Sequence, residues 1–398
     1  MPAPIFRKGL DLKHAVAGEL ARDYHSRILD RIRESDFVWR SGRLTLHLAR
    51  EFGFCYGVDR AVDYAYQTRR KFPDRTVFLT GEIIHNPHVN ARLRSAGIRF
   101  LSDPGEEIAQ VTAGDVVILP AFGVTITALE QLVGCGCTLV DTTCGSVLNV
   151  WKNVRRYARD GYTAIIHGKV QHEETQATAS QVRVASGGHY VIVLDREEAG
   201  VLCEFIRGRM DAATLLDRLG PGCSAGFDPA RDLVRVGLAN QTTMLMSESL
   251  EVGESIRRAM LDRYGEAALP RHYRAFDTIC SATQDRQDAV VGLLDEQRFD
   301  LAIVIGGYNS SNTRNLARIC AERVATYHIS DPSCLEPAIV RHLPSGGRPG
   351  AEIATRDWLP RGAPLTVALT AGASTPDNIV GEVVERLSDL AGGELSAS

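Results

Sequence analysis

The chain repeats one local pattern along most of its length: a short apolar run, a turn of small or polar residues, and then a stretch with helical spacing. Apolar runs rich in β-branched residues predict buried strands, and apolar residues three or four positions apart predict helices. The predicted strands span residues 44–49, 76–80, 115–120, 162–167, 190–195, 234–239, 301–307 and 365–371. Helical patterns follow most of them, as at 145–161 and 310–323. This alternation predicts an α/β fold with mostly parallel sheets.

Two segments depart from this pattern. Residues 1–44 have the spacing of an amphipathic, helix-rich extension and contain no chemical motif. Residues 207–232, with the phrase GPGCSAGFDPARD, have the glycine and proline content of a surface insertion between a helix and a strand. At 398 residues the chain is too long for one ordinary compact core, so we expect two or three domains.

The composition narrows the classes of function. Hydrophobic residues make up 44% and charged residues 24%, as in ordinary globular proteins. A formal net charge of −4 and a pI near 6.3 argue against a nucleic-acid partner. No apolar run approaches the ~20 residues of a membrane-spanning helix, and the acidic N-terminal segment resembles neither a secretory signal nor a transit peptide. We therefore expect a cytoplasmic protein that binds neither nucleic acid nor a membrane.

Nine cysteines without a secretion signal indicate reduced thiols, some of which can be metal ligands. Three of them, Cys55, Cys144 and Cys280, each follow a predicted strand or turn and precede a predicted helix. The last two also share the phrase Asp-Thr-x-Cys. The N-terminus of a helix favours the thiolate, which is the form that binds metal. A single cysteine of this kind is more often a buried structural residue, but three matched positions favour a metal site.

Two kinds of metal site remain open from the residues alone. Zinc would need the three cysteines and one histidine from His85, His167 or His172. An iron–sulfur cluster would leave one iron without a protein thiolate. Cys135 and Cys137 are separated by a single residue, which is tighter than the usual spacing of metal ligands. We assign these two as non-ligands together with Cys203, Cys223, Cys320 and Cys334.

Polar groups gather at the ends of the predicted strands, where parallel sheets bind ligands. His85, the pair His172 and Glu174, and Thr242 in NQTT combine hydrogen-bond donors with a possible proton carrier. Taken one at a time, such residues are more often hydrogen-bonded structural groups or N-caps. Two further junctions combine hydroxyl or amide side chains with a helix start, which together can bind an anion; they contain Ser310, Ser311, Asn312 and Ser374.

These clusters occur in one order along the chain: GFCYGVDRAV, GEIIHNPHVN, DTTC, HGKVQHEET, NQTT, DTICSATQDRQ, GYNSSNTRNL and TAGASTPD. Together they resemble the family of 4-hydroxy-3-methylbut-2-enyl diphosphate reductases, the last enzymes of the non-mevalonate isoprenoid pathway. The resemblance extends from about Leu44 to about Asp389. PAFG at 120–123 and HGKVQHEET resemble the cyanobacterial and plant branch of the family.

The resemblance implies a fold of three similar α/β domains, arranged as a cloverleaf around one central 4Fe–4S cluster with an open iron. Cys55, Cys144 and Cys280 would hold this cluster. The implied division is a helical extension at 1–44, a first domain at 45–140 with Cys55, a second at 141–275 with Cys144 and the insertion 207–232, and a third at 276–398 with Cys280 and a C-terminal tail.

The resemblance also implies the chemistry. The substrate would lose its hydroxyl group, with two electrons and two protons, to give isopentenyl and dimethylallyl diphosphate. Glu174 would be the proton donor and Thr242 would lie beside the substrate hydroxyl, with Thr178 as a second candidate for the same place. The substrate diphosphate would contact His85, His172, Ser310, Ser311, Asn312 and Ser374. Ferredoxin or flavodoxin would supply the electrons.

The chain departs from the family pattern at two positions. Gly145 stands where a proline usually follows the second cysteine, and Phe122 replaces a histidine of many bacterial members. These differences concern substrate placement and leave the proposed ligands and acid in place. The two rival functions are an iron–sulfur redox sensor and a zinc-dependent hydrolase on the same scaffold. A sensor could dispense with Glu174 and the anion-binding residues, which this chain retains.

Overall fold

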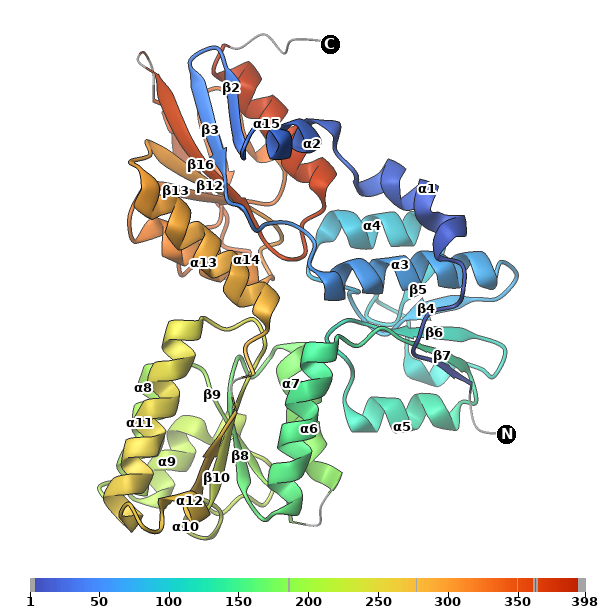
Figure 1. Cartoon of the computed structure of the whole chain (residues 1–398). Coiled ribbons are helices and arrows are strands. Elements are labelled where there is room, and N and C mark those ends of the chain that lie inside the picture. Colours follow the sequence, from blue (N-terminus) through green and yellow to red (C-terminus); the bar gives the residue numbers. More distant parts are fainter. Residues whose placement is uncertain are drawn as a thin grey trace. The chain divides into compact units, whose positions relative to one another are not determined.

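The computed structural model describes residues 4–184, 187–276, 278–348, 350–360, 362 and 364–392. The chain divides into two compact units (Figure 1). Unit 1 comprises Met1–Ile5 and Leu101–Cys280, and unit 2 comprises Phe6–Phe100 and Ser281–Ser398. The end of the predicted C-terminal tail, from 393 onward, lies outside the described residues.

The predicted fold class is confirmed as an α/β fold with three mostly parallel sheets. All eight predicted strands are present and end within two residues of the predicted positions. Both helical patterns are helices as well, α6 at Gly145–Arg159 and α14 at Ser311–Ala321. None of the helices in the described ranges combines the length and the apolar content needed to cross a bilayer.

Unit 1 contains a four-stranded parallel sheet with the order β11-β10-β8-β9. Its strands are β8 (Thr163–His167), β9 (Tyr190–Val193), β10 (Val236–Asn240) and β11 (Tyr273–Ala275). Successive side chains of a strand face opposite sides of its sheet. Ala164 and Ile166 pack with residues of α6, whereas Ile165 packs with α8 (Arg196–Ile206) and α11 (Met246–Tyr264). Helices α6 and α11 therefore cover opposite faces of this sheet (Figure 1).

The rest of unit 1 consists of a second group of parallel strands and of helices. Strand β6 (Val116–Leu119) pairs with β7 (Thr138–Asp141). The predicted insertion contains short helices, and its Leu215 and Leu219 are buried in the core beside α8. The remaining helices are α5 (Ile126–Gly134), α7 (Glu173–Ser180), α9 (Ala212–Leu219), α10 (Pro229–Asp232), α12 (Leu269–His272), η1 (Ile108–Gln110), η2 (Gln181–Val184) and η3 (Gly220–Gly222).

Unit 2 contains a five-stranded sheet with the order β13-β12-β16-β3-β2. Its strands are β2 (Val38–Ser41), β3 (Leu44–Leu48), β12 (Leu301–Ile305), β13 (Thr326–Ile329) and β16 (Leu365–Ala371). Only β2 runs antiparallel, in a hairpin with β3. Ile303 packs against α2 (Arg27–Glu34) and α15 (Asp377–Leu390), whereas Ala302 and Val304 pack against α13 (Ser281–Glu296) and α14 (Figure 1).

The rest of unit 2 comprises helices, a parallel strand pair and an antiparallel ribbon. Strand β4 (Val77–Leu79) pairs with β5 (Ile98–Phe100), and β14 (Ile339–His342) pairs with β15 (Ile353–Arg356). The remaining elements are α1 (Lys13–Tyr24), α3 (Tyr56–Lys71), α4 (Pro87–Ser95) and η4 (Pro332–Cys334). A short strand, β1 (Ile5–Phe6), lies at the division between the units.

Candidate functional site

Cys144 and Cys280 lie at chain positions that are built in the same way. Cys144 is the N-cap of α6, and its backbone N–H donates to the carbonyl of Ala121, 3.0 Å away. Cys280 precedes α13, and its N–H donates to the carbonyl of Thr242 at 3.2 Å. Each cysteine is thus tied to the loop that follows a neighbouring parallel strand.

The threonine of the shared Asp-Thr-x-Cys phrase explains this similarity. The hydroxyl of Thr142 donates to the carbonyl of Leu119, the last residue of β6, at 2.6 Å. In the second phrase, the N–H of Asn240, the last residue of β10, donates to the hydroxyl of Thr278, also at 2.6 Å. Each threonine therefore links the loop that carries its cysteine to the last residue of the neighbouring parallel strand by a hydrogen bond. Sequence inspection noted the phrase but not this role.

Glu174 and Thr242 form a closed, buried pair within unit 1. The backbone N–H of Thr242 donates to Oε1 of Glu174 at 2.6 Å, and its hydroxyl donates to Oε2 at 3.0 Å. Glu174 is 1% exposed and Thr242 is 4% exposed. A buried carboxyl group needs such partners, because burial without hydrogen bonds costs several kcal/mol. Thr242 is therefore the partner of the carboxyl group rather than a simple helix cap.

Gln241 fixes the position of this pair, and sequence inspection did not identify it. Its Oε1 accepts from the N–H of Lys169 and from the hydroxyl of Thr175, both at 3.1 Å, and its Nε2 donates to the hydroxyl of Thr243 at 2.8 Å. One buried amide thus joins the loop after β8, helix α7 and the loop after β10. The NQTT phrase was the available signal.

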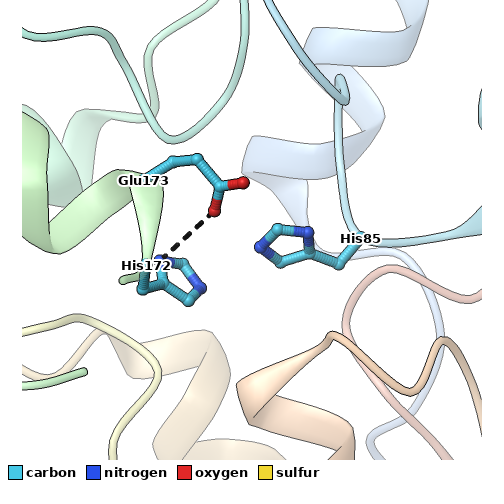
Figure 2. A group of neighbouring side chains, drawn as sticks. All are labelled: His85, His172 and Glu173. Carbon is cyan, nitrogen blue, oxygen red and sulfur yellow. Dashed lines mark ion pairs between the residues drawn. The ribbon is translucent and has the colours of Figure 1, made fainter. Parts of the chain in front are cut away.

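His172 begins helix α7, and its ring also has a local structural role. Nδ1 accepts from the N–H of Glu174 at 3.2 Å, so that His172 is the N-cap of α7. Because Nδ1 is an acceptor, the neutral ring carries its proton on Nε2 and can donate it to a ligand. Figure 2 shows the ring with its 4.0 Å contact to the exposed carboxylate of Glu173. The ring of Phe122 meets His172 edge to face at 5.7 Å.

These groups form one continuous set of contacts within unit 1. Cys280 is bonded to Thr242, and Thr242 is bonded to Glu174 on α7. One turn further along α7, Ala177 packs with Val147 and Trp151 of α6, and Cys144 packs against the same three residues. The acid, its threonine and two of the three proposed cysteine ligands therefore lie around the start of α7. The hydroxyl of Thr178, on the same helix, accepts from the indole N–H of Trp151 at 3.2 Å.

In unit 2, Cys55 is held by the loop after β16. Cys55 is the N-cap of α3, and its N–H donates to the carbonyl of Ala373 at 3.2 Å. The preceding loop turns at Gly53, which has φ +69°, and the buried guanidinium of Arg286 donates to the Gly53 carbonyl at 2.7 Å. Arg286, within the phrase DTICSATQDRQ, is a second positioning residue that sequence inspection did not identify.

The same loop carries Ser374 and faces the start of α14. Oδ1 of Asn312 accepts from the N–H of Ala373 at 2.9 Å, and the hydroxyl of Ser374 donates to the carbonyl of His85 at 3.2 Å. Ser310 is the N-cap of α14, with Oγ accepting from Thr313 N–H at 3.3 Å, so its hydroxyl can still donate. The buried Ser311 follows it as the first residue of α14.

Asn312 carries an unused donor at this helix start. The residue is 2% exposed, and its Nδ2 is a buried nitrogen without a hydrogen-bond partner among the described residues. A buried N–H that lacks an acceptor costs about 1–3 kcal/mol. An anion at the positive end of α14 would satisfy it.

His85 is fixed on both sides within unit 2. Its Nδ1 lies 2.8 Å from Oε2 of Glu82, which favours a proton on Nδ1. Its carbonyl approaches Gly307 so closely that a Cβ there would lie 2.4 Å from the oxygen. Only glycine therefore allows the segment after β12 to approach the backbone of His85 this closely. The ring of His85 is labelled in Figure 2.

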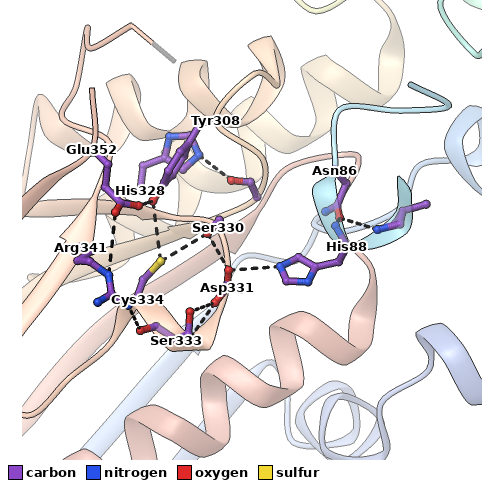
Figure 3. A network of polar contacts seen from close by, with 12 residues as sticks. Asn86, His88, Tyr308, His328, Ser330, Asp331, Ser333, Cys334, Arg341 and Glu352 are labelled. Atoms are coloured by element: carbon purple, nitrogen blue, oxygen red, sulfur yellow. Dashed lines mark hydrogen bonds and ion pairs between the residues drawn. The ribbon is translucent and has the colours of Figure 1, made fainter. Parts of the chain in front are cut away.

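The segment after His85 is anchored by a longer polar network (Figure 3). Asn86 caps α4 by accepting from the N–H groups of His88 and Val89. Nε2 of His88 lies 3.3 Å from Oδ2 of Asp331, which also accepts from the hydroxyl of Ser330 at 2.8 Å. The network continues through Cys334, Tyr308 and Glu352. It holds α4, and with it the His85 loop, against the segment after β13.

The His88–Asp331 pair makes the stability of unit 2 depend on pH. Their hydrogen bond raises the pKa of His88 and lowers the pKa of Asp331. The raised pKa contributes stability that is complete below the unfolded value of about 6.5 and is lost as pH rises through the folded pKa. The lowered pKa contributes above the unfolded value of about 3.9 and is lost as pH falls through the folded pKa.

We therefore expect the free energy of unfolding to fall more steeply from about pH 6 to about pH 9 in the wild-type protein than in His88→Gln. Denaturant titrations at both pH values would measure the free energy of unfolding of each protein. The contributions of all other titrating groups are common to both proteins and cancel when the two are compared. The pair is partly exposed, so the effect is small. Identical pH dependence in the two proteins would exclude a contribution from His88.

The cysteines differ in ways that bear on metal binding. None of the nine forms a disulfide, and Cys55, Cys144 and Cys280 are partly exposed at helix starts. Several of the other cysteines have the surroundings of structural residues, because they are buried or hydrogen-bonded to the backbone. Burial raises the pKa of Cys203 and Cys223 to about 11 and of Cys320 to about 12, and the Cys137 thiol donates to a backbone carbonyl. The donor chemistry of the first three therefore fits an iron–sulfur cluster held by three thiolates.

Known proteins with similar sequences share one activity. The family model described as LytB protein matches residues 46–388. A 4-hydroxy-3-methylbut-2-enyl diphosphate reductase of Synechococcus sp. (strain CC9311) is 45% identical over 386 residues, covering 96% of this chain and 94% of the relative. The reductase of Gloeobacter violaceus is 46% identical over 402 residues, covering 99% and 94%.

Solved structures show the same fold. The structure of (E)-4-hydroxy-3-methyl-but-2-enyl diphosphate reductase, the terminal enzyme of the non-mevalonate pathway, is 30% identical with a TM-score of 0.52, covering 86% of this chain and 99% of that one. The E-1-hydroxy-2-methyl-but-2-enyl-4-diphosphate reductase of Plasmodium falciparum has a TM-score of 0.62 at 21% identity, covering 86% and 87%, and supports the fold alone.

Proposed function

The chain belongs to the LytB family of 4-hydroxy-3-methylbut-2-enyl diphosphate reductases of the non-mevalonate isoprenoid pathway, and we propose that the groups described above bind this substrate and protonate its leaving oxygen. The overall reaction takes two electrons and two protons, releases water, and gives isopentenyl and dimethylallyl diphosphate. The contact between Glu174, Thr242 and the Cys280 loop carries the proposal, because it joins a buried acid to a proposed metal ligand.

We propose that Cys55, Cys144 and Cys280 hold one 4Fe–4S cluster with an open iron, which would supply the electrons and polarise the substrate hydroxyl. Three partly exposed cysteines at helix starts, none of them in a disulfide, support this assignment. The domain division at 45–140, 141–275 and 276–398, with one ligand in each domain around the cluster, belongs to the same proposal. Reduced thiols are also what a cytoplasmic location requires.

Glu174 is the proposed proton donor, acting through Thr242. The backbone N–H of Thr242 holds Oε1. When Oε2 carries a proton, its hydrogen bond with the Thr242 hydroxyl reverses, so that Oε2 donates and the hydroxyl accepts. That hydroxyl can accept this proton and pass its own to the oxygen that leaves the substrate. Because the pair is buried, bulk water does not compete for the proton. The leaving oxygen thus departs as water.

The diphosphate is the group that the unit 2 residues are suited to bind. The start of α14 offers Ser310, Ser311 and the unused donor of Asn312, and the loop after β16 adds Ser374. His85 is a further proposed partner of the diphosphate in unit 2, and His172 is the proposed donor from unit 1. Hydrogen bonds to an ionised acceptor are stronger than those between neutral groups.

The proposed function is tested on protein purified without oxygen. We expect brown protein with about one cluster per chain that converts the diphosphate substrate to both products when a low-potential reductant is supplied. Colourless protein that retains zinc would favour the hydrolase alternative. Brown protein that fails to turn over the substrate with any reductant would favour the redox sensor.

Asn312→Ala is expected to weaken binding of the diphosphate substrate about ten- to hundred-fold, because one hydrogen bond to a charged group contributes about 1.5–3 kcal/mol. Calorimetric titration would measure this change, and an analogue without the diphosphate should lose much less. Asn312→Asp serves as the matched variant, since it keeps the acceptor for Ala373 N–H but places a negative charge beside the anion. Wild-type affinity in both variants would exclude Asn312 from the diphosphate site.

A further inference from the structure

The exposed face of α6 is basic, although the whole chain carries a formal charge of −4. Residues three or four positions apart share one face of a helix. Lys152, Arg156 and Arg159 have this spacing and are all exposed, and none of them has a carboxylate partner among the described residues of the chain. The α6 stripe, as we call these three residues, is thus an unpaired positive surface.

Other arginines on the surface of unit 1 are neutralised by nearby acids. The ion pairs are Arg183–Glu130, Arg196–Glu251, Arg207–Asp262, Arg218–Glu197, Arg231–Asp232, Arg257–Glu254 and Arg274–Asp160. Asp160, the acid next to the α6 stripe, is itself paired with Arg274, so these ion pairs leave the three basic residues of the stripe without a carboxylate partner.

Exposed apolar side chains lie between the α6 stripe and the cysteine loops. Leu148, one turn after Cys144 on the same face of α6, is 44% exposed. Phe276, four residues before Cys280, is 37% exposed, and the guanidinium of Arg156 covers its ring at 4.4 Å. Both segments that form this surface thus lead directly to proposed cluster ligands.

This arrangement fits one kind of partner. Transient interfaces bury little area, with an apolar centre and a charged rim that governs the rate of association. The reaction needs two electrons, which must come from outside the chain one at a time. We propose that the α6 stripe with Leu148 and Phe276 is the docking surface for a small, acidic one-electron carrier protein. This inference rests on the proposed function, because it requires a cluster that accepts electrons.

In each of two encounters, one reduced carrier gives up one electron and leaves oxidised. Two carriers thus supply the two electrons of each turnover, and the two protons come through the acid described above. Lys152 lies about 12 Å along the α6 axis from Cys144, at 1.5 Å per residue, so that the carrier would meet the helix close to a ligand. The positive rim raises the encounter rate and loses its effect at high salt.

The test uses cluster-loaded protein and an acidic [2Fe–2S] ferredoxin as the probe. We expect the double variant Lys152→Glu/Arg156→Glu to lower the rate of cluster reduction by ferredoxin about tenfold or more at low ionic strength, and to weaken ferredoxin binding in calorimetry. The difference should shrink as salt increases. Cluster reduction and turnover with a reduced viologen, which needs no docking surface, should remain at the wild-type level.

Arg258→Glu is the control for charge reversal elsewhere on unit 1, since it reverses one exposed positive charge, half the change of the double variant, on α11, which covers the opposite face of the sheet. Phe276→Ser tests the apolar centre of the docking surface. It should lower the rate of cluster reduction by ferredoxin without changing how that rate depends on salt. Wild-type reduction rates and binding in the double variant would overturn the docking surface. Failure of the wild-type protein to turn over substrate with the viologen would instead overturn the proposed function, while the ferredoxin reduction rates would still decide the docking.

Discussion

Replacing Cys55, Cys144 or Cys280 singly with serine is expected to remove both the visible absorption of the cluster and the turnover of the substrate. A serine hydroxyl does not ionise near neutral pH and is a poor ligand for iron in such clusters, which are held by thiolates. The substitution preserves size, and the N-cap positions of α3 and α6 accept serine well. The loss should therefore come from the ligand and not from misfolding.

Cys135→Ser and Cys137→Ser provide the control, and both should keep nearly full iron content and activity. Cys137 is fully buried with its thiol directed at the carbonyl of Leu132, 3.4 Å away, and Cys135 lies 3.9 Å from the carbonyl of Ile108. Iron analysis and visible spectra of protein prepared without oxygen would compare all five variants. A Cys280→Ser protein with a full complement of iron would refute the ligand assignment.

The main strands could be predicted because each is a β-branched run with a turn beside it, as at Leu301–Ile305. Two other strands gave no such signal. Thr138–Asp141 and Thr326–Ile329 contain polar residues and only four positions each. They are strands because a parallel neighbour supplies their hydrogen bonds, which is a tertiary effect that local propensity does not contain.

For the N-terminal extension, too, the sequence predicted the local structure but not its tertiary contacts. Its helical spacing was visible, but the partner of its apolar side was not. Leu29 and Ile32 of α2 are fully buried in the core of unit 2, and Val38–Ser41 adds an antiparallel edge strand to the sheet. Periodicity predicts that a helix has an apolar face, whereas packing decides what covers it.

In the candidate site, residue types could be chosen from the sequence but their partners could not. Arg286 bonds to Gly53, 233 positions away, and Glu174 bonds to Thr242, 68 positions away. Such contacts depend on which strands are neighbours in a sheet. Sequence inspection therefore found the groups that carry the proposed chemistry but missed Gln241 and Thr278, which position them.

Glu174→Gln is expected to lower turnover by about 10²–10⁴-fold, the usual contribution of a general acid, while the substrate still binds. The glutamine can keep both contacts with Thr242: its carbonyl oxygen accepts from the backbone N–H, and its amide can donate to the hydroxyl, which then turns its own proton outward. Fold and substrate position are thus preserved, and only the transferable proton is lost.

The neighbouring substitution Glu173→Gln tests whether this effect is specific to the buried carboxyl group. The side chain of Glu173 is 58% exposed and its carboxylate lies 4.0 Å from Nδ1 of His172, so that a proton transfer that depends on the buried Glu174 should leave turnover close to wild type. Single-turnover kinetics would separate binding from the chemical step in both variants. If Glu174→Gln turned over as fast as the wild-type protein, the proton would have to come from another group. His172 would then be the next donor to test, because its Nδ1 accepts from the N–H of Glu174 and the neutral ring therefore carries its proton on Nε2.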